Sequence, residues 1–183
     1  MGRPKGEIRI EDRPILKYLL ERFSWPGPTL LVTAPGREHP PAWERFEREV
    51  VDPVHDQGPL RGILTALQHL RTPLLLVATV DMPAIAVSQL HWLLDEMRKS
   101  PNQLGLMLRR SVETTAIEPF PSALRAGARE IISRRIHAGE LSVQKLIEEK
   151  GFEVVSAPAS WDSRTWANLN VPADLTNFTD SMS

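Results

Sequence analysis

Residues 74–83 read Leu74-Leu75-Leu76-Val77-Ala78-Thr79-Val80-Asp81-Met82-Pro83. The first seven side chains are apolar apart from one threonine, and they do not alternate with polar ones. Such a run is typical of a strand that is buried on both faces, which usually lies in the centre of a parallel sheet. Pro83 stops the strand because it has no N–H to donate. The pattern predicts a central strand over residues 74–80, with Asp81 at its carboxyl end.

Helices and strands alternate on both sides of this run. Residues 60–70 and 87–98 have helical periodicity, residues 29–33 are rich in β-formers, and residues 14–23 form an amphipathic helical pattern. We also expect helices at 42–49, 123–137 and 142–150, and strands at 50–51, 104–108, 153–156 and 166–169. This alternation predicts an α/β sandwich with a mixed, mostly parallel sheet and helices on both faces.

The length, net charge and composition of the chain restrict the class of protein. With 183 residues, a net charge of -1 and no Cys, the chain fits one domain without disulfides or thiolate metal sites. We expect that domain over residues 1–178 and a flexible polar tail at 179–183. The balanced charge indicates no nucleic-acid partner, and no apolar run suits a membrane span or a signal peptide. A cytoplasmic location is therefore expected.

Asp81 is the strongest single candidate for a functional residue. Ligand sites of open α/β sheets lie in the crevice at the carboxyl ends of the strands. A lone carboxylate there suits Mg²⁺ when a nucleoside triphosphate provides further oxygen ligands. The alternative is a helix N-cap or a turn aspartate, which also follows strands often.

The stretch from Gly58 to Gly62 reads Gly-Pro-Leu-Arg-Gly and opens a helical pattern. Two glycines at a helix start let the backbone approach a ligand, and the N–H groups there favour an anion or a carbonyl. Asp52 precedes this turn, and its carboxylate could accept hydrogen bonds from a guanine edge or a ribose. The alternatives are an ordinary loop that enters a helix and a solvated Asp-Pro turn.

Three further polar residues lie near the ends of the chain. Lys5 follows a bend at Arg3-Pro4 and could pair with a phosphate, although an isolated lysine is more often a surface residue. Asn168 and Asn170 flank one leucine, so in an extended segment their side chains would share a face. They could bind a polar substrate, or they could cap the last helix, which starts at Pro172.

Four of these motifs together resemble the molybdenum cofactor guanylyltransferase family (MobA). They are residues 1–5 (Met-Gly-Arg-Pro-Lys), Asp52 followed by 58–63 (Gly-Pro-Leu-Arg-Gly-Ile), 80–83 (Val-Asp-Met-Pro) and 168–175 (Asn-Leu-Asn-Val-Pro-Ala-Asp-Leu). The similarity extends from the first residue to about residue 175, and it depends on the order and spacing of all four motifs.

The resemblance implies a Rossmann-like nucleotidyltransferase fold and a specific reaction. That reaction is the transfer of GMP from GTP to molybdopterin, the organic part of the molybdenum cofactor, with release of pyrophosphate. Mg²⁺ would be the cofactor, and molybdoenzymes or cofactor chaperones would be the protein partners.

The resemblance also implies roles for individual residues. Lys5 would contact the GTP phosphates, Asp81 would hold Mg²⁺, and Asp52 would hold the nucleotide on its base side. The other nucleotide-binding positions would be Thr33, Gly58 and Gly62. The pterin side would be bordered by Asn168 and Asn170.

The chain departs from the family pattern at two places. The family motif Leu-Ala-Gly-Gly-x-Ser-x-Arg-Met-Gly would begin before Met1, so we expect either an upstream start or a truncated form without the first strand. Thr33 stands where the family usually has Asn. Two alternatives follow: a cytidylyl- or sugar-phosphate nucleotidyltransferase, and a catalytically impaired remnant that only binds. The Gly-Pro-Leu-x-Gly motif favours the guanylyl branch.

Overall fold

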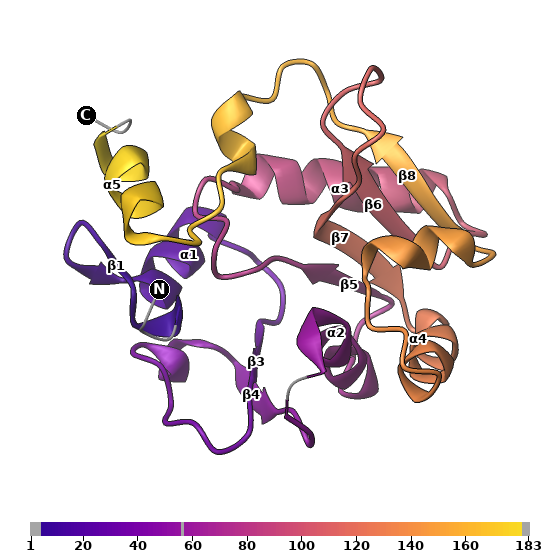
Figure 1. Cartoon of the computed structure of the whole chain (residues 1–183), viewed down its shortest axis with the longest axis horizontal. Helices are drawn as coiled ribbons and strands as arrows, with labels where there is room; N and C mark the ends of the chain where they lie inside the picture. The colour runs from indigo at the N-terminus through magenta and orange to yellow at the C-terminus, as the bar shows by residue number, and fades with distance from the viewer. Residues whose placement is uncertain (1–4, 56, 181–183) are drawn as a thin grey trace.

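The computed structural model describes residues 5–55 and 57–180 (Figure 1). The strands are β1 (Arg9–Ile10), β2 (Arg13–Pro14), β3 (Leu30–Thr33), β4 (Arg48–Val51), β5 (Leu74–Val77), β6 (Gly105–Arg109), β7 (Glu118–Arg125) and β8 (Phe152–Ser156). The α-helices are α1 (Ile15–Phe23), α2 (Gly58–Gln68), α3 (Val87–Lys99), α4 (Ala128–His137) and α5 (Pro172–Asp180). The 3-10 helices are η1 (Lys5–Glu7), η2 (Trp43–Arg45), η3 (Gln144–Glu148) and η4 (Ser163–Trp166).

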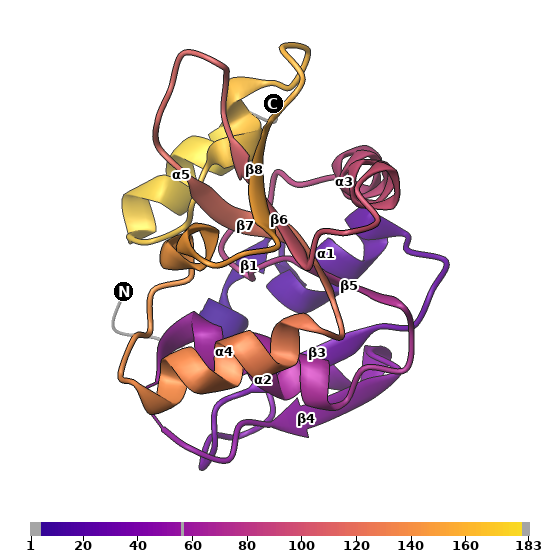
Figure 2. The same ribbon diagram turned by 90° about the vertical axis from the view of Figure 1, so that its right-hand side faces the viewer.

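The largest sheet has the strand order β5-β7-β6-β8. Strand β7 pairs antiparallel with both neighbours, whereas β6 and β8 are parallel. Helix α3 lies on one side of this sheet, and α2 and α4 lie on the other (Figures 1 and 2). The α/β class with a mixed sheet is therefore confirmed, with more antiparallel pairing than the alternation of elements suggested.

A second, smaller sheet joins β3 and β4 in parallel, from Leu30 opposite Arg48 to Thr33 opposite Val51. Helix α2 packs against β3, β4 and β5, so it connects the two sheets. Within the described part of the chain, β3 pairs only with β4, and β5 pairs only with β7.

Strand β5 differs from the expected central strand in length and in burial. It ends at Val77, opposite Ser122, rather than at residue 80. The next position of β7 is Pro121, which has no N–H, so the ladder cannot continue there. All four β5 residues are partly exposed, because one edge of the strand has no strand partner among the described residues. Strand β5 is therefore an edge strand of the described sheet, paired antiparallel with β7, and the prediction of a central parallel strand was wrong.

Four other expected elements also have a different structure. The helix expected at 42–49 is the short η2 followed by β4, because pairing with β3 outweighs the local helical pattern. The first part of the helix expected at 123–137 belongs to β7, and α4 starts only at Ala128. The helix expected at 142–150 is η3, and the strand expected at 166–169 is replaced by the end of η4 and irregular chain.

Two apolar clusters form the core. The larger cluster joins the four-stranded sheet to α2, α3 and α4. The smaller cluster brings together α1, the N-terminal segment, the loop after β5 and the C-terminal segment. Its buried members include Ile8, Ile10, Ala84, Leu169 and Phe178. The smaller cluster therefore joins the N-terminal part of the chain, including α1, to the loop after β5 and to the C-terminal segment, which are far apart in the sequence.

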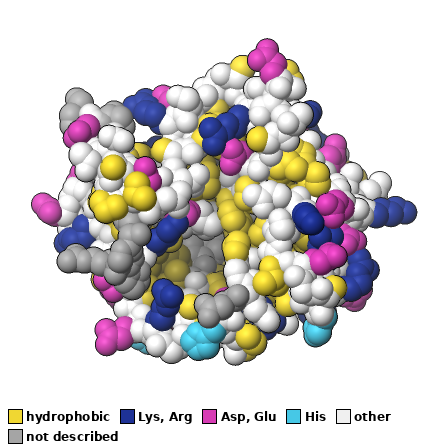
Figure 3. All heavy atoms as spheres, viewed as in Figure 1, with side chains coloured by type: hydrophobic (Ala, Val, Ile, Leu, Met, Phe, Trp, Pro, Cys, Tyr) yellow, Lys and Arg dark blue, Asp and Glu magenta, His cyan; other side chains and the backbone are white. Residues whose placement is uncertain are grey.

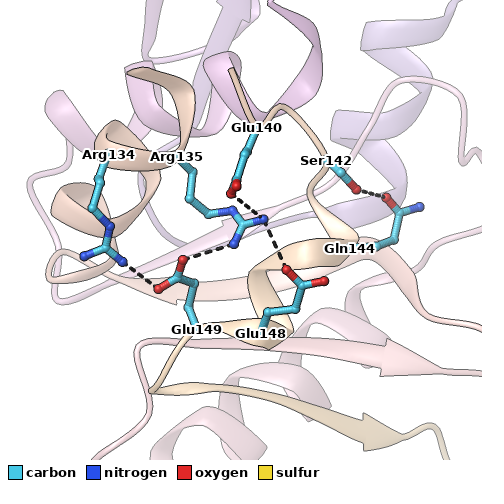
Figure 4. Close-up of polar contacts among 7 residues, drawn as sticks. All are labelled: Arg134, Arg135, Glu140, Ser142, Gln144, Glu148 and Glu149. Atoms are coloured by element: carbon cyan, nitrogen blue, oxygen red, sulfur yellow. Dashed lines mark hydrogen bonds and ion pairs between the residues drawn. The ribbon is translucent and has the colours of Figure 1, made fainter. Parts of the chain in front are cut away.

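A buried arginine connects α4 to the segment that contains η3 (Figure 4). The Arg135 side chain is only 5% exposed and forms ion pairs with Glu140 at 2.9 Å, Glu148 at 3.5 Å and Glu149 at 3.0 Å. Arg134 also pairs with Glu149, at 2.6 Å. None of these residues is a candidate functional residue, and their contacts indicate a structural role.

The C-terminal boundary expected at residue 179 falls inside α5, which continues to Asp180, and residues 181–183 lie outside the described residues. No helix in the described part of the chain is long and apolar enough to span a membrane.

Candidate functional site

Three candidate residues from distant parts of the sequence meet at one point, and we call them the cation cluster. The Lys5 ammonium lies 2.5 Å from Oδ2 of Asp81 and donates a hydrogen bond to Oδ1 of Asn170 at 3.0 Å. Sequence reasoning alone could not bring Lys5 and Asn170 together, because 165 positions separate them.

Packing beneath the cation cluster explains why its members meet. The backbone N–H of Leu169 donates to the carbonyl of Asp81 at 2.8 Å, which fixes the segment before α5 to the loop after β5. The Leu169 side chain is fully buried in the smaller apolar cluster, together with Ile8, which follows η1. The apolar contacts thus set the backbone, and the polar side chains meet above them.

Asp174 fixes the backbone around Asn170. Its carboxylate accepts hydrogen bonds from the N–H groups of Asn170, at 2.7 Å, and Val171, at 2.8 Å. The backbone hydrogen bonds from Val171 and Asn170 lower the pKa of Asp174, because they stabilise the charged carboxylate. Asp174, rather than Asn168 or Asn170, therefore caps the start of α5.

The two asparagines do not act as a pair. Asn170 accepts from Lys5, whereas the Asn168 amide donates to the carbonyl of Trp166 at 3.4 Å. Leu169 between them is buried, and the two amides have different partners although only one residue separates them.

The Lys5–Asp81 pair is accessible to solvent. The Lys5 side chain is 37% exposed and the Asp81 side chain is 21% exposed. Ion pairs of this exposure contribute about 1 kcal/mol or less to stability, because water screens them. The pair can therefore open at a modest cost when a charged ligand arrives.

A second group of candidates surrounds the start of α2, and we call it the Asp52 cluster: Thr33, Asp52, Gly58 and Gly62. The N–H of Asp52 donates to the carbonyl of Thr33 at 2.8 Å. A side chain at Gly62 would start 3.8 Å from Oδ2 of Asp52, so the helix and the carboxylate lie in close contact. Oδ1 of Asp52 is buried and has no hydrogen-bond partner within the described residues.

The start of α2 is open and uncapped. Gly58 has a positive φ of 63°, which favours glycine, and a Cβ added to it would meet no atom of the described residues within 4 Å. The Gln57 side chain forms no cap, although N–H groups of the first helical turn have no partner inside a helix. Oε1 of Gln57 and Nε of Arg61 are buried without a described hydrogen-bond partner.

The surface is hollowed over β3, between the N-terminal segment and α2 (Figure 3). Hydrophobic side chains border this hollow (Figure 3). A separate surface cavity of about 470 Å³ is lined by residues of α2 and α4, among them Gln68 and Arg129, and contains none of the candidate residues.

Thr33 has a partner that sequence reasoning missed. Its hydroxyl donates to Oε1 of Glu49 at 2.8 Å, and Nδ1 of His39 lies 2.7 Å from the other oxygen of that carboxylate. The His39 ring in turn stacks on Trp43, with centroids 4.2 Å apart. The sequence did not indicate a role for Glu49, because residues 42–49 have a helical pattern. The register of β4 against β3 is the signal that could have placed Glu49 beside Thr33.

Asp81 provides the only candidate carboxylate for a metal in the cation cluster. Among residues 5–55 and 57–180, no three His, Asp or Glu side chains gather as a metal site. Mg²⁺ is compatible with such a site, because it commonly uses one or two carboxylates and fills its shell with water and phosphate oxygens. The amide oxygen of Asn170, which shares Lys5 with Asp81, adds a neutral oxygen donor.

A comparison with protein-family models shows the family of the chain. The family model described as "MobA-like NTP transferase domain" matches residues 1–155. The chain belongs to the MobA-like NTP transferase family. It is therefore a member of a nucleotidyltransferase family, as the four motifs implied, although the first four residues of the first motif lie outside the described residues.

Known relatives agree with this assignment. The molybdenum cofactor guanylyltransferase of Shewanella piezotolerans is 20% identical over 99% of this chain and 86% of that protein. Molybdopterin-guanine dinucleotide biosynthesis protein A from Archaeoglobus fulgidus has a similar structure, with a TM-score of 0.80, 22% identity and coverage of 99% and 91% of the two chains. The 2-C-methyl-D-erythritol 4-phosphate cytidylyltransferase of Thermus thermophilus has a TM-score of 0.73 at 16% identity, with coverage of 98% and 94%.

Proposed function

We propose that this nucleotidyltransferase transfers GMP from GTP to molybdopterin and releases pyrophosphate. Membership of the MobA-like family and the name of the Shewanella relative support this choice of substrates. The observation that carries the proposal is the convergence of Lys5, Asp81 and Asn170 at the carboxyl side of β5. A cation and a carboxylate at such an edge suit a metal-bound triphosphate.

The residues of the chain have separable tasks in this proposal. The unpaired Oδ1 of Asp52 accepts hydrogen bonds from the nucleotide on its base side, and the open start of α2 offers N–H donors. The Lys5 ammonium offsets negative charge on the phosphates. Orientation of the two substrates and neutralisation of charge account for the catalysis, and neither step requires a covalent intermediate with the protein.

Asp81 would hold Mg²⁺, with water and phosphate oxygens completing its shell. The ion supplies Lewis-acid polarisation of the phosphoryl oxygens when it is bound. Molybdoenzymes or cofactor chaperones as protein partners stay a prediction from the family resemblance.

The proposal is tested by incubating the full chain with molybdopterin and GTP labelled on the α-phosphate. We expect label to appear in molybdopterin guanine dinucleotide, and the same assay on the Asp81→Asn variant serves as the negative control. Binding of GTP without transfer would contradict the catalytic proposal and favour a form that only binds nucleotide.

A cytidylyltransferase activity is the second candidate. The fold shared with the Thermus cytidylyltransferase motivates it, together with Thr33, which stands where the guanylyltransferase pattern usually has Asn. Parallel assays with CTP and GTP decide between the two. A higher transfer rate with CTP would overturn the guanylyl assignment.

A further inference from the structure

The cation cluster places an ammonium at the carboxylate that the proposed function assigns to a metal. Lys5 Nζ lies 2.5 Å from Oδ2 of Asp81. A divalent cation such as Mg²⁺ would bind the same oxygen at about 2.1 Å. The two positive charges would then lie almost in contact, so both cannot occupy Oδ2 at once.

Asp81 alone provides too few ligands for a metal ion to displace Lys5 readily. Within the described ranges, no second and third carboxylate or imidazole gathers around it. A divalent ion at Asp81 would therefore take most of its ligands from water or from phosphate oxygens. Free metal would thus have to compete for a carboxylate to which Lys5 is already bonded.

Lys5 also has a second acceptor to which it can move. Oδ1 of Asn170 lies 3.0 Å from the ammonium, and the Asn170 backbone is fixed by Asp174. Lys5 begins the short η1 turn, and its side chain is 37% exposed, so a small rotation can separate it from Asp81. Asn170 can keep the ammonium in the site after that separation.

We propose that Lys5 is the resting counter-ion of Asp81, that Asn170 is a positioning residue for its ammonium, and that a divalent cation replaces Lys5 only when nucleotide enters with it. This inference rests on the proposed function. The phosphates give the displaced ammonium a new anionic partner and give the metal its missing oxygen ligands. Metal and nucleotide therefore bind cooperatively, and metal alone binds weakly.

Binding of Mn²⁺, measured by electron paramagnetic resonance with and without GTP, tests the inference on the full chain. In the Lys5→Gln variant, we expect Mn²⁺ alone to bind about three- to tenfold more tightly, because the competing charge is gone. Mn²⁺ with GTP should bind about tenfold more weakly, because the phosphates lose a cation. The two changes have opposite signs, which a loss of structure would not produce.

Lys17→Gln is the matched control. Lys17 also faces a carboxylate, Glu21 at 3.8 Å, and its side chain is 36% exposed. We expect both affinities of this variant to stay within twofold of the wild type. Asn170→Ala should give no gain in affinity for Mn²⁺ alone, because Lys5 keeps Asp81 as a partner and loses the second acceptor to which it could move.

Adding Asp81→Asn to Lys5→Gln should abolish the gain in affinity for Mn²⁺ alone. Paramagnetic broadening of the Asp81 and Met82 amide signals in the Lys5→Gln chain locates the ion independently of that double variant.

An unchanged affinity for Mn²⁺ alone in Lys5→Gln, or a gain that persists without the Asp81 carboxylate, would overturn the inference. GTP binding by the wild type in that case would leave the proposed function standing. A gain for Mn²⁺ alone with no GTP binding by any variant would contradict the proposed function and uphold the competition.

Discussion

The cation cluster and the Asp52 cluster differ in how their polar groups are satisfied. In the first, Lys5, Asp81 and Asn170 already bond to one another. In the second, Oδ1 of Asp52 is buried without a described partner, and the start of α2 has no side-chain cap. A buried polar atom without a partner costs about 1–3 kcal/mol, which a ligand recovers when it bonds there. The Asp52 cluster should therefore set nucleotide affinity, whereas the cation cluster should set the rate of transfer.

Asp81→Asn provides the strongest test of that division, because it removes the charge on which the cation cluster depends. We expect the rate of GMP transfer to fall by about 100-fold, the order of magnitude typical for loss of one electrostatic group in an active site. Asp95→Asn on α3 is the control, since the Asp95 side chain is 59% exposed and pairs with Arg98 on the same helix. A transfer rate within threefold of the wild type would show that Asp81 has no part in the reaction.

Asp52→Asn should weaken GTP binding by about 10- to 30-fold, because an amide replaces one of two carboxylate acceptors with a donor. The transfer rate at saturating GTP should change little. Titration calorimetry measures the affinity, and Glu47→Gln, an exposed position just before β4, is the control. If the rate fell and the affinity stayed constant, the assigned roles of the two clusters would have to be exchanged.

Asn170→Ala and Asn168→Ala should separate two residues that the sequence presents as a pair. Asn170 bonds to Lys5, so its loss should lower GMP transfer about fivefold, whereas loss of Asn168 should lower it less than twofold. Equal effects of the two substitutions would instead indicate that the two side chains serve the substrate together, as their expected shared face implies.

The smallest expected effect is a pH dependence of stability from Asp174. Its pKa is lowered by hydrogen bonds from the backbone of Val171 and Asn170, so its contribution to stability is fully present above its ordinary pKa of 3.8. That contribution disappears as the pH falls through the lowered pKa. The unfolding free energies of wild type and Asp174→Asn should therefore differ at pH 7 and converge in acid, as urea titrations can measure. Asp180→Asn on the same helix should not change the unfolding free energy, and a difference between wild type and Asp174→Asn that does not shrink as the pH falls below 3.8 would exclude the charge as its cause.

The sequence predicted long apolar elements better than it predicted elements that depend on a distant partner. Helices near 15–23, 60–68 and 87–99 follow their own periodicity and were expected within a few residues. The first half of strand β4, residues 48–49, was expected as the end of a helix, because only its pairing with β3 makes it extended. Strand β5 was expected to reach residue 80, because nothing in its own sequence shows that Pro121 lies opposite.

The same limit applies to the candidate site. The motifs identified Lys5, Asp81 and Asn170 separately, but their contact depends on packing of Ile8 and Leu169 in the smaller apolar cluster. The bond between Thr33 and Glu49 depends on strand register, which the sequence pattern did not reveal. Residue identity could thus be predicted locally, whereas residue contacts required the tertiary structure.

Hydrogen exchange of the full chain with and without GTP and Mg²⁺ tests most directly whether both clusters serve one nucleotide. We expect slower exchange in residues 49–62 around the Asp52 cluster and also in residues 78–82 and 168–171 around the cation cluster. Slower exchange at only one of the clusters, or at neither, would contradict this account of the site.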